Sequence, residues 1–136
     1  MIKQDFISKY IQELAKTLAK IMALEIGNSD EGFLILFNQM LHAYYKIDDN
    51  QLEVLCLENQ ERDQFLLADE LRKKNILTYL KATRLYLRNN SQEKAENCFK
   101  IVERIKNTHT GIFQFPTEED QRIEEEYNKL KEKFNF

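Results

Sequence analysis

The chain has 136 residues, of which 43% are hydrophobic and 32% are charged, and its net charge is −3 at pH 7. A chain of this length suits one domain and can bury roughly two thirds of its unfolded surface, so these proportions exclude a disordered protein. Because nucleic-acid phosphates select proteins with an excess of positive charge, the balance also speaks against DNA or RNA as a partner.

The N-terminal third predicts two helices. Residues 3–26 carry apolar side chains at steps of three and four, which fits the period of an α-helix. Gly27 and Asn28 then supply a left-handed helix stop, and Ser29 can cap a second helix over residues 30–45. The whole chain has only three glycines and one proline, and this scarcity favours long helices over β-turns.

The middle of the chain predicts one short and one long helix. Asp48 or Asp49 can cap the short helix, because an aspartate side chain accepts hydrogen bonds from the first free backbone N–H groups. Residues 61–89 follow, and their apolar pattern predicts one continuous helix. We expect it to bend at residues 73–75, since asparagine is a poor helix former.

The C-terminal third predicts two further helices. Ser91 can cap a helix that reaches about Thr108. The last helix begins after Pro116 and Thr117, opens with three acidic residues and ends with lysines, a polarity that suits the helix macrodipole. Its apolar stripe is narrow, which predicts a helix on the surface of the body. The stripe consists of Ile123, Tyr127, Leu130 and Phe134.

These segments predict an all-α fold, a helical bundle of five or six helices in a single domain over residues 1–136. We expect N-terminal helices over residues 1–58 and a repeat-like hairpin over residues 59–109. A loop and an acidic C-terminal helix then occupy residues 110–136.

Part of the hairpin follows a spaced pattern of small and bulky residues. The unit covers residues 76–109, with Ile76 at the first position of the pattern. In this unit Val102 stands where the pattern has an alanine, and the closing proline of the pattern is absent. The other places are filled by Tyr79, Ala82, Thr83, Tyr86, Ala95 and Phe99. This pattern resembles one tetratricopeptide repeat, a pair of helices in 34 residues.

The resemblance implies a helix pair of the α-α superhelix type that binds other proteins. One such pair buries only part of its apolar surface, so other elements must cover its open sides. We expect the first two helices to cover one side and the last helix the other, with a homodimer as the alternative. The segments Asp5–Ile21 and Ile112–Tyr127 also resemble uncharacterised bacterial all-helical proteins, a resemblance that implies no activity.

Four bases recur along one side of the predicted hairpin's first helix, at Lys74, Lys81, Arg84 and Arg88. They allow three interpretations: a cationic groove for an acidic peptide or a terminal carboxylate, a solvated helix face, or a dock for the acidic start of the last helix. The repeat register predicts its partner-binding residues as Leu77, Leu80, Lys81, Arg84 and Arg88.

No spacing of side chains indicates catalysis or metal binding. Neither His42 nor His109 belongs to a metal-ligand motif, and the glycines are too dispersed for a phosphate-binding loop. Cys56 and Cys98 have apolar neighbours and are expected to be inert core thiols. We therefore expect no enzyme activity, no cofactor and no metal.

The remaining expectations concern partners and location. No signal peptide or apolar run of membrane length is found, which predicts a cytoplasmic protein. The first helix has a net charge of only +1, too little for a membrane-surface helix. The sequence thus predicts a non-catalytic protein-interaction or scaffold module. The alternative is a small enzyme or ligand-binding protein whose polar site, around His42 with Tyr44 or Tyr45, forms only on folding.

Overall fold

A computed structural model describes residues 2–23, 30–108 and 117–134, with the side chains of residues 2–6 left out. Every regular element in these ranges is helical, and no strand occurs in them, which confirms the all-α class. The elements are α1 (Ile2–Ala23), α2 (Asp30–Met40), η1 (Leu41–Tyr45), η2 (Asp49–Cys56), α3 (Gln60–Leu66), η3 (Asp69–Leu71), α4 (Arg72–Arg88), α5 (Gln92–Thr108) and α6 (Glu118–Lys133). The expected helix stop at Gly27 and Asn28, the cap at Ser29 and His109 lie outside the described residues.

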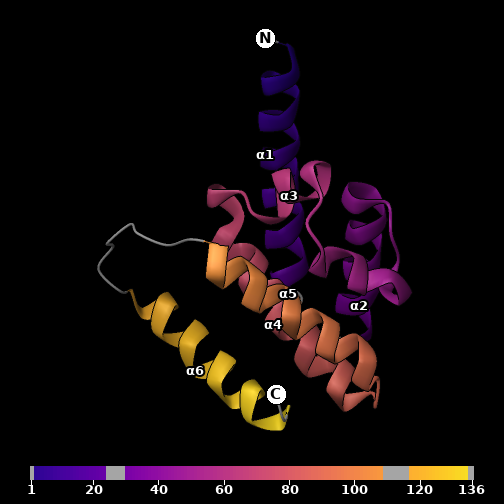
Figure 1. Cartoon of the computed structure of the whole chain (residues 1–136), viewed down its shortest axis with the longest axis vertical. Helices are drawn as coiled ribbons and strands as arrows, with labels where there is room; N and C mark the ends of the chain where they lie inside the picture. Colours follow the sequence, from indigo (N-terminus) through magenta and orange to yellow (C-terminus); the bar gives the residue numbers. More distant parts are fainter. Residues whose placement is uncertain (1, 24–29, 109–116, 135–136) are drawn as a thin grey trace.

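Helix α4 is the central element. It packs along α5 as an antiparallel pair, and it also contacts α1, α2 and α6 (Figure 1). Ten of its seventeen residues are buried, and these lie on more than one side of the helix. A helix covered on several sides in this way lies inside a body rather than on its surface. The N-terminal part of α1 extends beyond the rest of the body (Figure 1).

The predicted helix over residues 61–89 is divided. When α2 with η1, and η3 with α4, are each counted as one, the described ranges contain seven helices instead of five or six. The break is at Leu67 and Ala68, where the chain turns extended, and not at residues 73–75. Asn75 lies inside α4 with its side chain fully buried. Its amide donates to the carbonyls of Phe65 and Leu66, each at 3.3 Å, and so satisfies the free C-terminal end of α3.

The helix predicted over residues 30–45 and the short helix predicted after it are both present, but the end of the first and the whole of the second are not α-helical. Residues 30–45 are helical throughout, but their last five form a π-helix that ends at Lys46, a residue in the left-handed region at φ 61°. Asp48 is the predicted cap of the next helix: its carboxylate accepts from Asn50 N at 2.9 Å. That helix, η2, is a 3₁₀-helix, and the side chain of Gln51 completes a capping box.

The turn between α4 and α5 is a Schellman motif. Asn90 adopts the left-handed conformation at φ 59°. The N–H of Ser91 donates to the carbonyl of Tyr86 at 2.8 Å, and the N–H of Asn90 donates to that of Leu87 at 3.2 Å. Ala95 N then donates to Ser91 O at 3.0 Å as α5 begins. These bonds reverse the chain within four residues and bring α5 back along α4.

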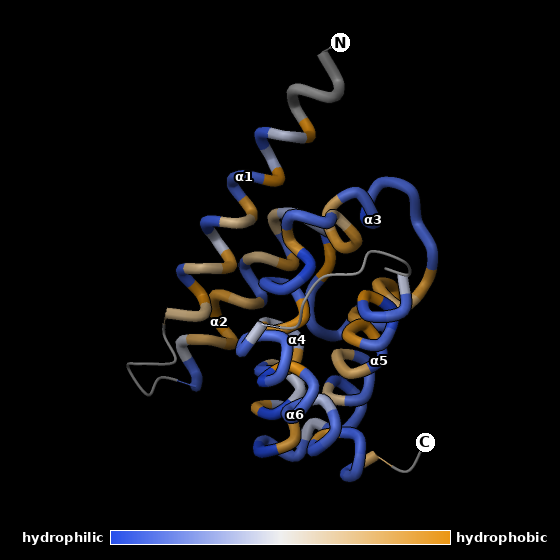
Figure 2. The backbone as a smooth tube through the Cα atoms, turned by 90° about the vertical axis from the view of Figure 1, so that its left-hand side faces the viewer, coloured by the Kyte–Doolittle hydropathy of each residue, from blue (hydrophilic) through white to orange (hydrophobic). Residues whose placement is uncertain are grey.

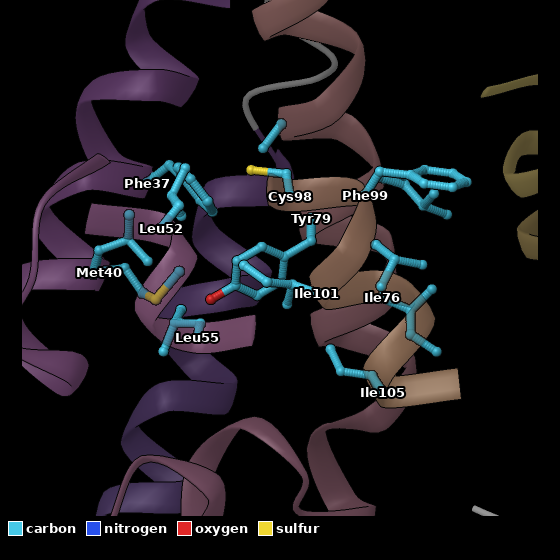
Figure 3. Close-up of a cluster of buried hydrophobic side chains, with 14 of the residues drawn as sticks. Phe37, Met40, Leu52, Leu55, Ile76, Tyr79, Cys98, Phe99, Ile101 and Ile105 are labelled. Atoms are coloured by element: carbon cyan, nitrogen blue, oxygen red, sulfur yellow. The ribbon is translucent and has the colours of Figure 1, made fainter. Parts of the chain in front are cut away.

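The core lies where α4 and α5 meet α2 and η2. Tyr86, Ala95 and Phe99, which the sequence places at the helix crossing, are all buried. Figure 3 shows Cys98 and Ile101 of α5 on the side of Tyr79 in α4, while Met40 and Leu55 approach from the opposite side. Alanine at position 95 allows the two backbones to lie close together. Whether this pair is a tetratricopeptide-like hairpin stays a prediction.

Candidate functional site

Helix α6 is a separate amphipathic helix that lies on the outside of the α4–α5 pair (Figures 1 and 2). Its start is fixed by a capping box, because Thr117 Oγ1 accepts from Asp120 N at 3.2 Å and Asp120 Oδ2 accepts from Thr117 N at 2.9 Å. The predicted start at Thr117 is thus confirmed. The Thr117 N–H, and after it Lys73, lower the pKa of the Asp120 carboxyl.

Aromatic packing holds the middle of α6 against α5. The rings of Tyr127 and Phe99 stack with centroids 5.1 Å apart and planes 9° apart. The Tyr127 hydroxyl donates to Glu103 Oε2 at 2.9 Å. Lys106 Nζ lies 3.5 Å from the centroid of the Tyr127 ring on α6. Burial and the bond to Glu103 together raise the pKa of Tyr127 to about 12, so the hydroxyl keeps its proton and donates at neutral pH.

Three ion pairs flank this aromatic contact. Arg84 of α4 bonds to Glu126 of α6. Lys73 Nζ lies 3.2 Å from Asp120 Oδ1, and Lys106 Nζ lies 2.7 Å from Glu124 Oε1. Two helices therefore direct three bases at the acids of a third. We call this surface the acid-helix face, defined by Lys73 and Arg84 of α4 with Phe99, Glu103 and Lys106 of α5.

The predicted partner-binding residues are divided among three environments. Arg84 belongs to the acid-helix face, and Leu77 is half-buried in α4 between Lys73 and Arg84. Leu80 and Lys81 are 0% and 4% exposed, so they do not line an open groove as expected.

The other predicted bases point to α2 instead. Lys81 Nζ lies 4.9 Å from the centroid of the Phe33 ring, which lies in α2. Arg88 is exposed and bonds to Asp30 Oδ2 at 3.1 Å. Because α4 is covered on one side by α2 and on the other by α6, Lys81 and Arg88 of the basic stripe lie toward α2 and Arg84 lies toward α6. Lys74, the fourth base of the stripe, is exposed. One of the three interpretations was that the acidic start of the last helix docks on the stripe. Arg84 does pair with α6, but through Glu126 in the middle of that helix, whereas Asp120 at its start pairs with Lys73, outside the stripe.

Sequence reasoning missed Lys73, Glu103 and Lys106 as site residues. Lys73 and Lys106 lie on different helices, so no regular spacing in the chain links them. Phe99 was expected in the core, and it is buried there, but its ring also stacks on α6. The one available signal was that α6 carries seven acids against four bases and must meet positive charge somewhere.

A second polar cluster surrounds Asp49 at the other end of the helix pair. Its Oδ2 accepts from Lys94 Nζ at 3.0 Å, from the Tyr86 hydroxyl at 3.1 Å and from Asn38 Nδ2 at 3.4 Å. Burial alone would raise the pKa of Asp49, but the bonds from Lys94 and Asn38 lower it below its usual range. A polar depression of about 380 Å³ opens beside it, next to Ser91. The carboxylate is already engaged by three donors, so it joins α2, α4 and α5 to η2 as a structural link.

The residues of the alternative polar site do not converge. His42 is exposed, Tyr44 is half-buried, and Tyr45 is buried with its ring edge-on to Phe65. In the described ranges no three potential metal ligands among His, Cys, Asp and Glu lie together. None of the helices described has both the length and the apolar character needed to span a membrane.

The two cysteines lie near each other at the packing of η2 on α5. Cys56 is half-buried and its Sγ lies 3.6 Å from Asn97 O, while Cys98 is fully buried. Burial raises the pKa of both thiols, and this keeps them protonated and unreactive at neutral pH.

No protein-family model, curated protein or solved structure matches this chain. Its class is therefore defined by the fold alone, as an all-helical protein in which an acidic amphipathic helix covers a basic and aromatic surface.

Proposed function

We propose that this protein is a non-catalytic protein-interaction module of the helical-repeat type, which binds partners through the α4–α5 pair. One observation carries the proposal: the pair already receives a separate amphipathic helix, α6, through three ion pairs and an aromatic stack. Aromatic side chains and arginine, here Phe99 and Arg84, are enriched at protein interfaces. A helix laid on a groove between helices is a common mode of peptide recognition.

The proposal includes the interpretation of residues 76–109 as a tetratricopeptide-like helix pair. It is supported by the burial of Tyr86, Ala95 and Phe99 at the crossing of α4 and α5. A single helix pair needs cover on both sides, and here α1 and α2 lie on one side and α6 on the other. The C-terminal segment that covers one side contributes fewer buried apolar residues than α1 and α2 do on the other, which makes its side the one for an exchangeable partner. The buried apolar residues are Ile123, Leu130 and Phe134 against Leu14, Leu18, Ile21, Phe33, Phe37 and Met40.

A charge-reversal experiment tests the function. The Arg84→Glu/Lys106→Glu chain reverses two bases of the acid-helix face. The Lys9→Glu/Lys16→Glu chain makes the same change in charge on the exposed surface of α1 and serves as the matched control. With folding verified by circular dichroism, we expect partners captured by the wild-type chain in native extract to be lost from the first variant and kept by the second. Partners that bind both variants equally would refute the proposed surface.

A further inference from the structure

We propose that the partner binds as an acidic amphipathic helix in the place of α6, and that α6 is the intramolecular competitor for this surface. The inference rests on the proposed function and adds the chemical class of the partner. It is drawn from the contacts that α6 itself makes, since these show what the acid-helix face accepts.

The acid-helix face contacts a defined pattern of acidic and apolar residues along one helix. The bases bond to acids at positions 120, 124 and 126, which spreads negative charge over nearly two turns of α6. The apolar positions are Ile123, Leu130 and Phe134, all buried, together with the stacked ring of Tyr127. A matching partner helix carries three acids spaced like positions 120, 124 and 126, an apolar residue between the first two, an aromatic residue directly after the last and apolar residues beyond it.

This combination of acidic and apolar contacts favours a helix over a smaller anion as the partner. A phosphate or a terminal carboxylate could bond to Arg84, but it would leave the ring of Phe99 without the flat partner that Tyr127 supplies at 5.1 Å. Phe134 lies at the same distance from the Phe99 ring. The face thus combines charge complementarity with an apolar strip, and an acidic amphipathic helix supplies both.

The contacts of α6 are of a kind that a partner can displace. The Lys73 and Arg84 pairs are part-exposed, with about a third of each base's side chain accessible, and such pairs contribute little net stability. Eight residues, 109–116, join α5 to the cap of α6. Because α6 belongs to the same chain as its binding surface, its docking is intramolecular, and a free helix has to compete with its effective concentration. A free helix of equal affinity therefore loses to α6, whereas a tighter one replaces it.

Two full-length variants and two peptides test the proposal. The Glu124→Lys/Glu126→Lys chain keeps the acid-helix face and repels its own α6. The Arg84→Glu/Lys106→Glu chain reverses the face and also repels α6. The fluorescent peptides have the sequence of residues 117–134, either unchanged or with Glu124→Lys and Glu126→Lys, and binding is measured by fluorescence anisotropy.

We expect the unchanged peptide to bind the Glu124→Lys/Glu126→Lys chain at least about tenfold more tightly than it binds the wild-type chain, in which α6 competes. We expect the reversed peptide to bind only the Arg84→Glu/Lys106→Glu chain. The chain with all four substitutions should restore the internal pairs and bind both peptides weakly. If charge repulsion unfolds a variant, the milder Glu126→Gln chain gives the same comparison with a smaller difference.

The outcomes separate this inference from the proposed function. If the Glu124→Lys/Glu126→Lys chain binds both peptides alike, or no more tightly than the wild-type chain does, the acidic-helix partner is wrong. The interaction function still stands in that case, provided that native partners are lost on reversal of Arg84 and Lys106. If native partners still bind the Arg84→Glu/Lys106→Glu chain, the proposed function is wrong, whichever chains the peptides bind.

Discussion

Replacing Tyr127 by alanine is expected to release α6 while leaving the rest of the fold intact. The substitution removes the ring that stacks on Phe99 at 5.1 Å, the hydroxyl that donates to Glu103 at 2.9 Å and the ring beneath Lys106. An aromatic pair contributes about 1 kcal/mol, a part-exposed cation–π contact about 0.5 kcal/mol and a hydrogen bond to a carboxylate about 1 kcal/mol. The free energy of α6 docking should therefore fall by about 2 to 3 kcal/mol.

Hydrogen exchange of backbone amides measures this loss directly. A change of 2 to 3 kcal/mol corresponds to roughly a 30- to 150-fold faster exchange of the α6 amides. Amides of α4 in the central core should keep their protection, because their bonds lie within the helix and its other sides remain covered. The Tyr127→Phe variant is the matched control: it keeps the stack and loses only the hydroxyl, so its α6 amides should exchange about fivefold faster.

Two results would contradict this reasoning. Unchanged exchange in α6 after Tyr127→Ala would mean that the aromatic contact does not hold the helix in place. An equal increase in α4 and α6 would mean that α6 is an inseparable part of the core, and then it could not serve as an exchangeable occupant.

Three further substitutions test the body of the fold. Asp63→Asn removes the negative charge and one of the two acceptors that Arg104 reaches at 2.7 and 2.8 Å, and should cost about 2 kcal/mol in urea unfolding at pH 7. Burial would raise the pKa of Asp63, but the Arg104 bonds lower it below its usual range. The pair therefore stabilises the fold above about pH 4. The difference in unfolding free energy between wild type and variant should shrink as the pH falls below that value. Asn75→Ala removes the side-chain donor from the carbonyls of Phe65 and Leu66, of which the first keeps the Ala68 N–H at 3.5 Å, and should lower stability by about 2 kcal/mol in the same assay. An unchanged midpoint would contradict the role given to this amide. Ala95→Leu should cost about 1 to 3 kcal/mol by overpacking the helix crossing, whereas a neutral melting temperature would show that α4 and α5 are not in close contact there.

The helices at the two ends of the hairpin were predictable because their signals are local. Thr117 and Asp120 stand three residues apart and form the capping box that starts α6. Asp48 caps η2 in the same way. Helix α5 reaches Thr108 as its apolar period predicts. At the two capping boxes the residues that fix the boundary lie within one turn of it, so a single stretch of sequence contains the information.

The division of α3 from α4 was not predictable in this way. No glycine or proline marks Leu67 and Ala68. The break depends on the buried amide of Asn75, which reaches back nine and ten residues to the end of α3. Asparagine did signal a deviation from a regular helix, but its effect falls on carbonyls that become neighbours only after the chain has folded.

The candidate site was predictable in part for a similar reason. The sequence indicates that Arg84 is a base on the hairpin and that the last helix is acidic, but it offers a contact between the two only as one of three interpretations. It also cannot show that Lys81 lies over the ring of Phe33 and is thereby removed from the surface. Pairing across helices is set by which elements cover α4, and such packing leaves no regular spacing in the chain.

The placement of Asn75 links the local unfolding of α3 to that of α4. Helix α3 has seven residues, fewer than an isolated helix needs to persist in water. Its last carbonyls are held by a side chain that belongs to α4. The two segments are therefore coupled: a fluctuation that unwinds the first turn of α4 also takes the Asn75 donor from the last carbonyls of α3, and α3 then depends on its remaining contacts, such as the Asp63–Arg104 pair.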